Sequence, residues 1–195
     1  MNELVGLAAF AFVGSVSPGP NNAVLWASGI RFGFARTVPY VIGTALGIGA
    51  LVVAVAAGLD VLLRAVPGIQ TALKVVGSAY LLYIAYLVLE GGGVGPATVA
   101  APPSLWQGVG FQWVNPKAWL FAIAAVGTFV PPGLHRAAGV ALVTVTIVGV
   151  VIMSASIWAV GGSALGRFTQ DERRRRVVGW VLASLLVASV ALIWI

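Results

Sequence analysis

Six long apolar segments, joined by short polar stretches, fill almost the whole of this 195-residue chain. They run roughly over residues 3–28, 38–59, 67–89, 104–130, 137–163 and 176–195. Each is close to or above the ~20 residues that a helix needs to cross ~30 Å of hydrocarbon. Only 8% of the residues are charged, too few to cover a soluble domain of this size. The sequence therefore predicts an all-α membrane protein with six transmembrane helices.

The first segment is interrupted near its middle by Ser17-Pro18-Gly19-Pro20-Asn21-Asn22. Proline lacks an amide hydrogen and clashes with the preceding turn, so a regular helix cannot run through this stretch. Gly19 is expected to let the backbone turn at little steric cost. Backbone groups freed inside hydrocarbon are tolerated only where they face protein or a water-filled cavity. The break therefore indicates either a binding site or a proline kink whose asparagines bond to neighbouring helices.

The fourth segment carries a second interruption, Trp113-Val114-Asn115-Pro116-Lys117. A Gly- and Pro-rich linker, 91–103, divides the chain into two sets of three segments, 1–90 and 104–195. With three segments each, the second set enters the membrane from the opposite side. Proline-interrupted segments at corresponding positions of two repeats are the best sequence indication of a transporter's binding site. We expect a single transmembrane domain, 1–195, of two inverted three-helix repeats, whose first and fourth helices are broken at mid-membrane and form the site together.

Lys117 is the costliest side chain to place, because an ionisable group at mid-bilayer costs several kcal/mol. No Asp or Glu lies at the centre of any segment, so Lys117 has no evident carboxylate partner. A substrate carboxylate would supply the missing anion. Two alternatives remain open. Burial can keep the lysine neutral, or its ammonium group can cap backbone carbonyls freed by Pro116.

The third segment carries Lys74, Gly77 and Tyr80 on one stripe of a helix. Gly77 would permit the close approach of another helix. Lys74 lies near the segment's end, so snorkelling to the interface is the simpler explanation of its charge. Tyr80 lies deeper and either lines a pathway or packs. The second segment has a small-residue face that we interpret as a packing surface, made of Gly43, Gly47, Gly49 and Ala50.

Positively charged residues predict the orientation. The first and fifth connections hold seven arginines, whereas the second and fourth hold two, Arg64 and Arg136. Arginine-rich short loops stay in the cytoplasm, so we expect the first, third and fifth connections inside and both termini outside. The run 173–176 is interpreted as a topology and lipid-headgroup anchor. Tryptophans at segment ends, where an aromatic belt is expected, are Trp26, Trp106, Trp180 and Trp194.

Several functional classes are excluded by what the chain lacks. It has no cysteine, which rules out disulfides and thiolate metal sites, and the single His135 makes no metal site. No nucleophile triad, phosphate loop or pair of carboxylates occurs, so we expect neither enzyme activity nor a cofactor. The net charge of +6 comes mainly from loop arginines and is no nucleic-acid signal. The expected partners are the lipid bilayer and a small-molecule substrate, and a homo-oligomer is compatible with the sequence.

Three motifs resemble those of the LysE/RhtB family of bacterial amino-acid exporters. Ser17-Pro18-Gly19-Pro20-Asn21 is similar to the family's first-helix motif, Lys74-x-x-Gly77-x-x-Tyr80-Leu81 to its third-helix motif, and Asn115-Pro116-Lys117-Ala118 to its fourth-helix motif. They occur in the family's order and extend over essentially the whole chain. The resemblance implies a multi-pass protein of the bacterial inner membrane that exports small amino acids from the cytoplasm. It also implies secondary transport that uses the proton motive force.

One departure from the family pattern bears on the substrate. Many members carry an acidic residue midway along the fifth helix, where this chain reads Val145-Thr146-Ile147-Val148-Gly149-Val150. The proton-coupling group is therefore unassigned, and cationic substrates are disfavoured. We expect the export of neutral amino acids or close derivatives. The expected substrate-binding residues are Ser17, Pro18, Gly19, Pro20, Asn21, Asn22, Tyr80, Trp113, Asn115, Pro116 and Lys117.

Two other functions stay open. The first is a substrate-binding membrane subunit that needs a separate energy-coupling partner, because such subunits also have six short helices and no ATPase motif. Copurification with an ATPase would favour it. The second is an ion or metal exporter of a related superfamily, which the lack of intramembrane acids, cysteines and histidine clusters disfavours.

The orientation can be tested by labelling, because the chain has no cysteine of its own. Single cysteines at Ser104 and Gln170 should be shielded from an impermeant thiol reagent added to intact cells. One at His135 should react. Labelling of the Gln170 site from outside would show that the orientation is the reverse of the predicted one.

Overall fold

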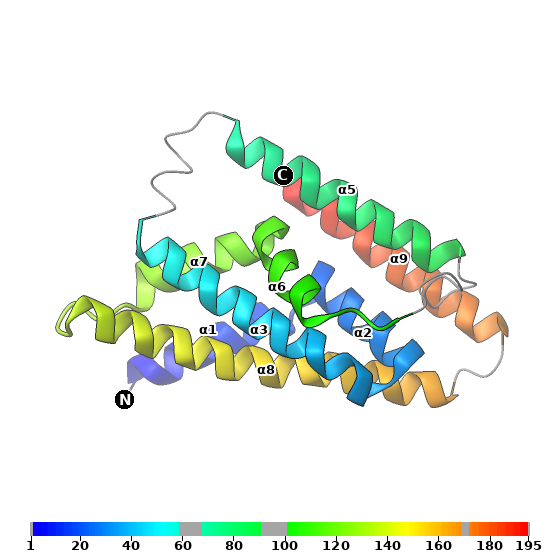
Figure 1. The fold of residues 1–195 in the computed structure, drawn as a ribbon, viewed down its shortest axis with the longest axis horizontal. Helices are drawn as coiled ribbons and strands as arrows, with labels where there is room; N and C mark the ends of the chain where they lie inside the picture. Colours follow the sequence, from blue (N-terminus) through cyan, green and yellow to red (C-terminus); the bar gives the residue numbers. More distant parts are fainter. Residues whose placement is uncertain (1, 59–67, 91–100, 169–171, 195) are drawn as a thin grey trace.

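The computed structural model describes residues 2–58, 68–90, 101–168 and 172–194, which form a bundle of α-helices with no strand among them. The helices are α1 (Asn2–Val16), α2 (Pro20–Phe32), α3 (Phe34–Ala56), α5 (Ile69–Glu90), α6 (Leu105–Val114), α7 (Pro116–Phe129), α8 (Arg136–Phe168) and α9 (Glu172–Trp194). The longer helices run roughly along the long axis of the molecule, and α5 lies beside α9 (Figure 1). The all-α class predicted from the sequence is confirmed.

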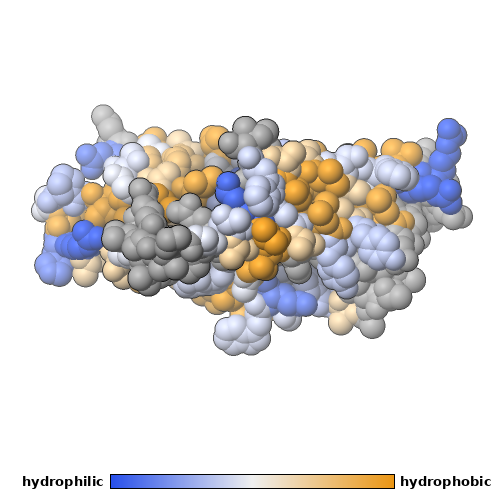
Figure 2. Space-filling view, turned by 90° about the horizontal axis from the view of Figure 1, so that it is seen from above, coloured by the Kyte–Doolittle hydropathy of each residue, from blue (hydrophilic) through white to orange (hydrophobic). Residues whose placement is uncertain are grey.

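Two of the described helices, α3 and α8, are each long and apolar enough to cross a membrane. α1 and α2 make a third span if the bent pair is taken as one. α7 and residues 176–188 of α9 are apolar but shorter. On the face in Figure 2, strongly hydrophilic residues lie mainly toward the two ends of the long axis, and hydrophobic residues are spread between them. These features are those of a membrane protein, while the full set of six spans stays a prediction.

Both predicted breaks are present. α1 ends at Val16 and α2 begins at Pro20, with a bend of 63° between them. α6 ends at Val114 and α7 begins at Pro116, with Asn115 extended between them (φ −91°, ψ 107°). The first amides of a helix have no partner within it, so a proline there costs no hydrogen bond. Each of these prolines therefore starts a new helix.

Several helices extend past the apolar segments that predicted them. α2 continues to Phe32 instead of ending near residue 28, α8 continues to Phe168 instead of 163, and α9 begins at Glu172 instead of 176. The additional residues include Arg31 and Arg167. Hydropathy marks where a chain leaves hydrocarbon, whereas backbone hydrogen bonds continue a helix into the polar layer. The predicted boundaries were too short for this reason.

The four tryptophans of the predicted aromatic belt differ in their exposure. Trp106, Trp180 and Trp194 are exposed on the bundle surface. Trp26 is different, because its indole nitrogen is buried and its ring packs on Trp158 with 5.1 Å between centroids. The belt interpretation is wrong for Trp26 because α2 continues past it into the bundle, so Trp26 is not at a helix end.

Helices of the two halves of the chain share one core. α3 packs on α6 and α7, α8 packs on α1 and α2, and α3 and α8 also contact each other. The largest apolar cluster takes residues from α1, α3, α7 and α8, among them Leu7, Ile48, Trp119 and Ile147. In each half, the helix that follows the broken one (α3 or α8) thus packs against the broken helix of the other half.

Glycines let two of these helix pairs touch backbone to backbone. The glycines between α3 and α6 are Gly43, Gly47 and Gly108, and those between α2 and α8 are Gly29, Gly162 and Gly166. A Cβ atom at any of them would come closer than 3.0 Å to a carbonyl oxygen of the facing helix. Small residues allow such close approach in membranes, where burial from water does not drive helices together. The predicted packing role of Gly43 and Gly47 is confirmed, while Ala50 is exposed.

Gly77 behaves as predicted from its motif. A Cβ atom there would collide with the carbonyl oxygen of Val114 and lie 3.4 Å from Pro116 Cδ. α5 therefore approaches the second break through this glycine. On the same helix, Lys74 Nζ lies over the ring of Trp194, 5.8 Å from its centroid.

Two glycines of α6 provide a matched test of the close packing. Gly108→Ala should lower the free energy of unfolding by ~1–3 kcal/mol, because an added methyl group overpacks against α3. Gly110→Ala should be neutral or stabilising by up to ~1 kcal/mol, because alanine favours a helix and nothing lies within 4 Å of its Cβ position. Thermal unfolding in detergent measures both, and equal effects would contradict the packing argument.

Candidate functional site

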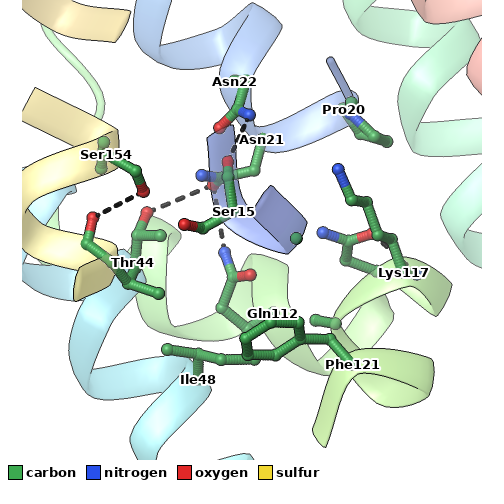
Figure 3. Close-up of a pocket in the computed structure, with 16 residues that line it drawn as sticks. Ser15, Pro20, Asn21, Asn22, Thr44, Ile48, Gln112, Lys117, Phe121 and Ser154 are labelled. Atoms are coloured by element: carbon green, nitrogen blue, oxygen red, sulfur yellow. Dashed lines mark hydrogen bonds between the residues drawn. The ribbon is translucent and has the colours of Figure 1, made fainter. Parts of the chain in front are cut away.

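A cavity of about 60 Å³ lies where the two breaks meet (Figure 3). One buried water needs ~10–15 Å³, so the space is large enough for several waters or a small solute. Its wall takes residues from α1, α2, α3, α6, α7 and α8. The polar side chains of the wall are Ser15, Asn21, Asn22, Thr44, Gln112, Asn115, Lys117 and Ser154. The two breaks, about a hundred residues apart in the chain, are thus brought together.

Lys117 reaches from the first turn of α7 to the first break. Its Nζ donates to Ser17 O at 2.9 Å, to Ser17 Oγ at 2.8 Å and to Pro18 O at 3.3 Å. The ammonium group has three hydrogens, and each has an acceptor here. Carbonyl capping, one of the alternatives left open by the sequence, is observed. The carbonyls are those freed at the first break, however, and not those freed by Pro116.

Gly19 makes room for this lysine. The sequence predicts a turn at Gly19, but its backbone is extended (φ −178°, ψ 175°), a conformation that any residue adopts. A Cβ atom at Gly19 would lie 3.1 Å from Lys117 Nζ and 3.2 Å from Lys117 Cδ. The glycine therefore provides space for the lysine side chain, and the turn argument is wrong.

Side chains from other helices satisfy the remaining oxygens at the end of α1. Asn22 Nδ2 donates to Ser15 O at 2.8 Å and to Ser17 O at 2.9 Å. Trp158 Nε1, from α8, donates to Val16 O at 3.1 Å. A backbone oxygen left without a donor would be costly inside a membrane. Asn22 and Trp158 therefore hold the break in its bent form.

Asn115 and Asn21 have different roles. Asn115 Oδ1 accepts from the amide of Lys117 at 3.2 Å and so caps α7. Asn21 Oδ1 accepts from Thr44 Oγ1 at 3.2 Å and from Gln112 Nε2 at 3.1 Å. Asn21 thus joins α2, α3 and α6 at the wall of the cavity (Figure 3).

Gln112 is the most buried of the cavity's amides, at 3% exposed. Its Nε2 also donates to Gly108 O at 3.4 Å. Its Oε1 has no hydrogen-bond partner within the part of the chain that the structure describes. Gln112 Oε1 is therefore an uncharged acceptor that the wall offers to a ligand.

Most of the predicted site residues lie at the cavity. Those that line it are Gly19, Pro20, Asn21, Asn22, Asn115 and Lys117. Ser17 and Pro18 lie beside it as the acceptors of Lys117, and Pro116 begins α7. Trp113 does not line it: its ring packs edge-on against Trp119, 6.0 Å between centroids, and its carbonyl accepts from Trp119 Nε1 at 2.8 Å. The side chain of Tyr80 lies outside what the structure describes.

The sequence reasoning missed Ser15, Thr44, Gln112, Phe121 and Ser154. Gln112 carried a usable signal, because it is an amide inside a long apolar segment and three residues before the second break. Ser154 carried none, because a helical serine can bond to its own backbone, as Ser154 Oγ does to Val151 O at 3.2 Å.

Two interrupted helices around a polar cavity are an architecture of membrane transporters. Comparison with known families agrees, because the family model described as LysE type translocator matches residues 12–193. The chain belongs to the LysE family of translocators, as its three motifs predict. It is accordingly a transporter.

Curated relatives cover nearly the whole chain. A cysteine/O-acetylserine efflux protein of Escherichia coli (strain K12) is 28% identical over 180 residues, which are 91% of this chain and 90% of the relative. A cysteine/O-acetylserine efflux protein of Salmonella paratyphi A (strain ATCC 9150 / SARB42) is 27% identical over 179 residues, with the same shares. No solved structure gives a significant match. Together with the apolar helices, these relatives indicate a multi-pass protein of the inner membrane.

The contribution of Lys117 to the stability of the protein, through its bonds to the first break, can be measured. Lys117→Met keeps most of the length of the side chain but removes all three donors, and hydrogen bonds to charged groups contribute ~1.5–3 kcal/mol each. The variant should lower the free energy of unfolding in detergent by at least ~2 kcal/mol. Ser17→Ala should lower the free energy of unfolding by less, because Lys117 Nζ keeps its two carbonyl acceptors.

The matched control is Lys74→Met, whose Nζ contacts the Trp194 ring and makes no hydrogen bond with a described residue. It should change the free energy of unfolding by less than ~1 kcal/mol. Equal losses in the Lys117 and Lys74 variants would show that the bonds to the first break contribute little.

Proposed function

We propose that this protein exports small neutral amino acids or close derivatives from the cytoplasm, and that the cavity between the two breaks binds them. The observation that carries the proposal is the character of the wall. Among the residues that line the cavity there are amides, hydroxyls and one cation, but no acid. The relatives named as cysteine/O-acetylserine efflux proteins support this substrate class, because both named compounds are small and carry no net charge at neutral pH.

Recognition follows from the charges of a zwitterionic amino acid. Its carboxylate lies beside Lys117, since unit charges 4 Å apart attract by ~4 kcal/mol at an effective dielectric constant of 20. Because the hydrogens of Lys117 are shared with Ser17 and Pro18, this attraction acts mainly through charge. The substrate's ammonium group binds the uncharged acceptor Gln112 Oε1 and the hydroxyl oxygens of Thr44 and Ser154. A second positive charge on the substrate has no acid here to pair with.

The proposed architecture is six spans in two inverted repeats, with both termini outside. The reciprocal packing of α3 on α6 and α7 and of α8 on α1 and α2 supports the repeat. The proposed energy source is the proton motive force, which the family resemblance implies. Export against a concentration gradient should then stop when the proton gradient is dissipated.

Transport in reconstituted vesicles tests the substrate class. Vesicles loaded with alanine, serine, lysine or arginine should release the neutral amino acids at least ~10-fold faster, which corresponds to 1.4 kcal/mol. Gln112→Glu adds an acid to the wall and should shift the preference toward lysine. Gln107→Glu is the control, because Gln107 lies on the same helix but is exposed and only caps Ser104 N.

The same vesicles test Lys117. Lys117→Met should abolish export while the protein remains inserted, and Lys117→Arg should not restore it, because the guanidinium is larger and planar. Full export by Lys117→Met would leave Lys117 a purely structural role. Preferred export of arginine by the unmodified protein would contradict the proposed substrate class.

A further inference from the structure

One side of the cavity is apolar. Phe121 of α7 and Ile48 of α3 line it together, away from Asn22 and Ser154 in this view (Figure 3). Both pack in the largest apolar cluster of the bundle. If the polar wall takes the charged groups of an amino acid, its side chain faces Phe121 and Ile48.

The ring of Phe121 is held from two directions by α1. It stacks on Phe10, with 5.0 Å between centroids and 13° between planes. Its edge lies against Gly14, where an added Cβ would come within 2.7 Å of Cε2 and 2.8 Å of Cδ2. Phe10 is in turn packed on Phe129, 5.3 Å away. The ring therefore cannot turn away from the cavity without moving its neighbours.

We propose that Phe121 sets the upper size limit of the substrate side chain, and that Gly14 sets the position of the ring. This inference rests on the proposed function, in which the amino acid occupies this cavity. Within about 60 Å³ a short side chain fits beside the ring, whereas a long or aromatic one meets it. Each methylene in an apolar pocket changes selectivity by ~10–200-fold, so one ring is enough to separate short from long substrates.

Two substitutions should move the size limit in opposite directions. Phe121→Ala removes the ring and should raise the export of methionine relative to serine by at least ~10-fold. Gly14→Ala adds a methyl group against the ring at the cavity wall, which leaves less space for a side chain, and it should lower the same ratio. The measurement is the rate at which reconstituted vesicles release serine, valine, methionine and phenylalanine. Because the readout is a ratio, the amount of active protein cancels.

Phe129→Ala is the matched control. Phe129 lies on the same helix and in the same aromatic group, but it is not among the residues that line the cavity. Its removal should leave the methionine-to-serine ratio unchanged. Phe121→Leu removes less side-chain volume than Phe121→Ala. It should also raise the methionine-to-serine ratio, by a smaller factor.

The outcomes separate this inference from the proposed function. If the unmodified protein releases none of the four amino acids faster than protein-free vesicles do, the proposed function fails and the inference fails with it. If it releases serine, but the Phe121 and Gly14 variants keep the original ratio, only the inference fails. A shift as large in Phe129→Ala would also overturn it, because the effect would then come from general loosening of the core. If neither Phe121 variant folds, Gly14→Ala decides.

Discussion

A chain that interrupts a helix inside hydrocarbon has to provide a donor for each backbone oxygen that it frees. At the end of α1 this requirement is met for every oxygen from Val13 to Pro18. The first two are bonded locally, by the amide and the hydroxyl of Ser17. The others accept from Asn22 of α2, Trp158 of α8 and Lys117 of α7. The bent conformation is therefore satisfied only when these helices are docked, so the break belongs to the bundle and not to α1 alone.

Two pairs of helices around the cavity are packed with their backbones in contact. Glycines bring α2 against α8 and α3 against α6, with backbone touching backbone. The two pairs contact each other through apolar residues of α3 and α8 and, at the cavity, through polar side chains: Asn21 of α2 accepts from Thr44 of α3 and from Gln112 of α6. The cavity therefore lies where the two pairs meet, beside the hydrogen bonds of Asn21.

The electrostatics of the cavity follow from how Lys117 is stabilised. Its charge is solvated by the fixed dipoles of Ser17 and Pro18 and not by an acid, so the lining residues keep a net positive charge. A neutral zwitterion gains from this field through its carboxylate, and a cation is repelled by it.

The sequence by itself determined the helical class, both breaks and the importance of Lys117. Hydropathy, the missing amide of Pro20 and Pro116, and the cost of a buried charge act locally, whatever the helices pack against. Only the tertiary structure decided that Lys117 binds the first break, that Phe121 lines the cavity and that Trp113 does not. These outcomes depend on which faces of distant helices meet. Helices that are apolar on all sides carry little polar periodicity to mark an inward face, so their contacts are set by shape and by glycine spacing across the folded bundle.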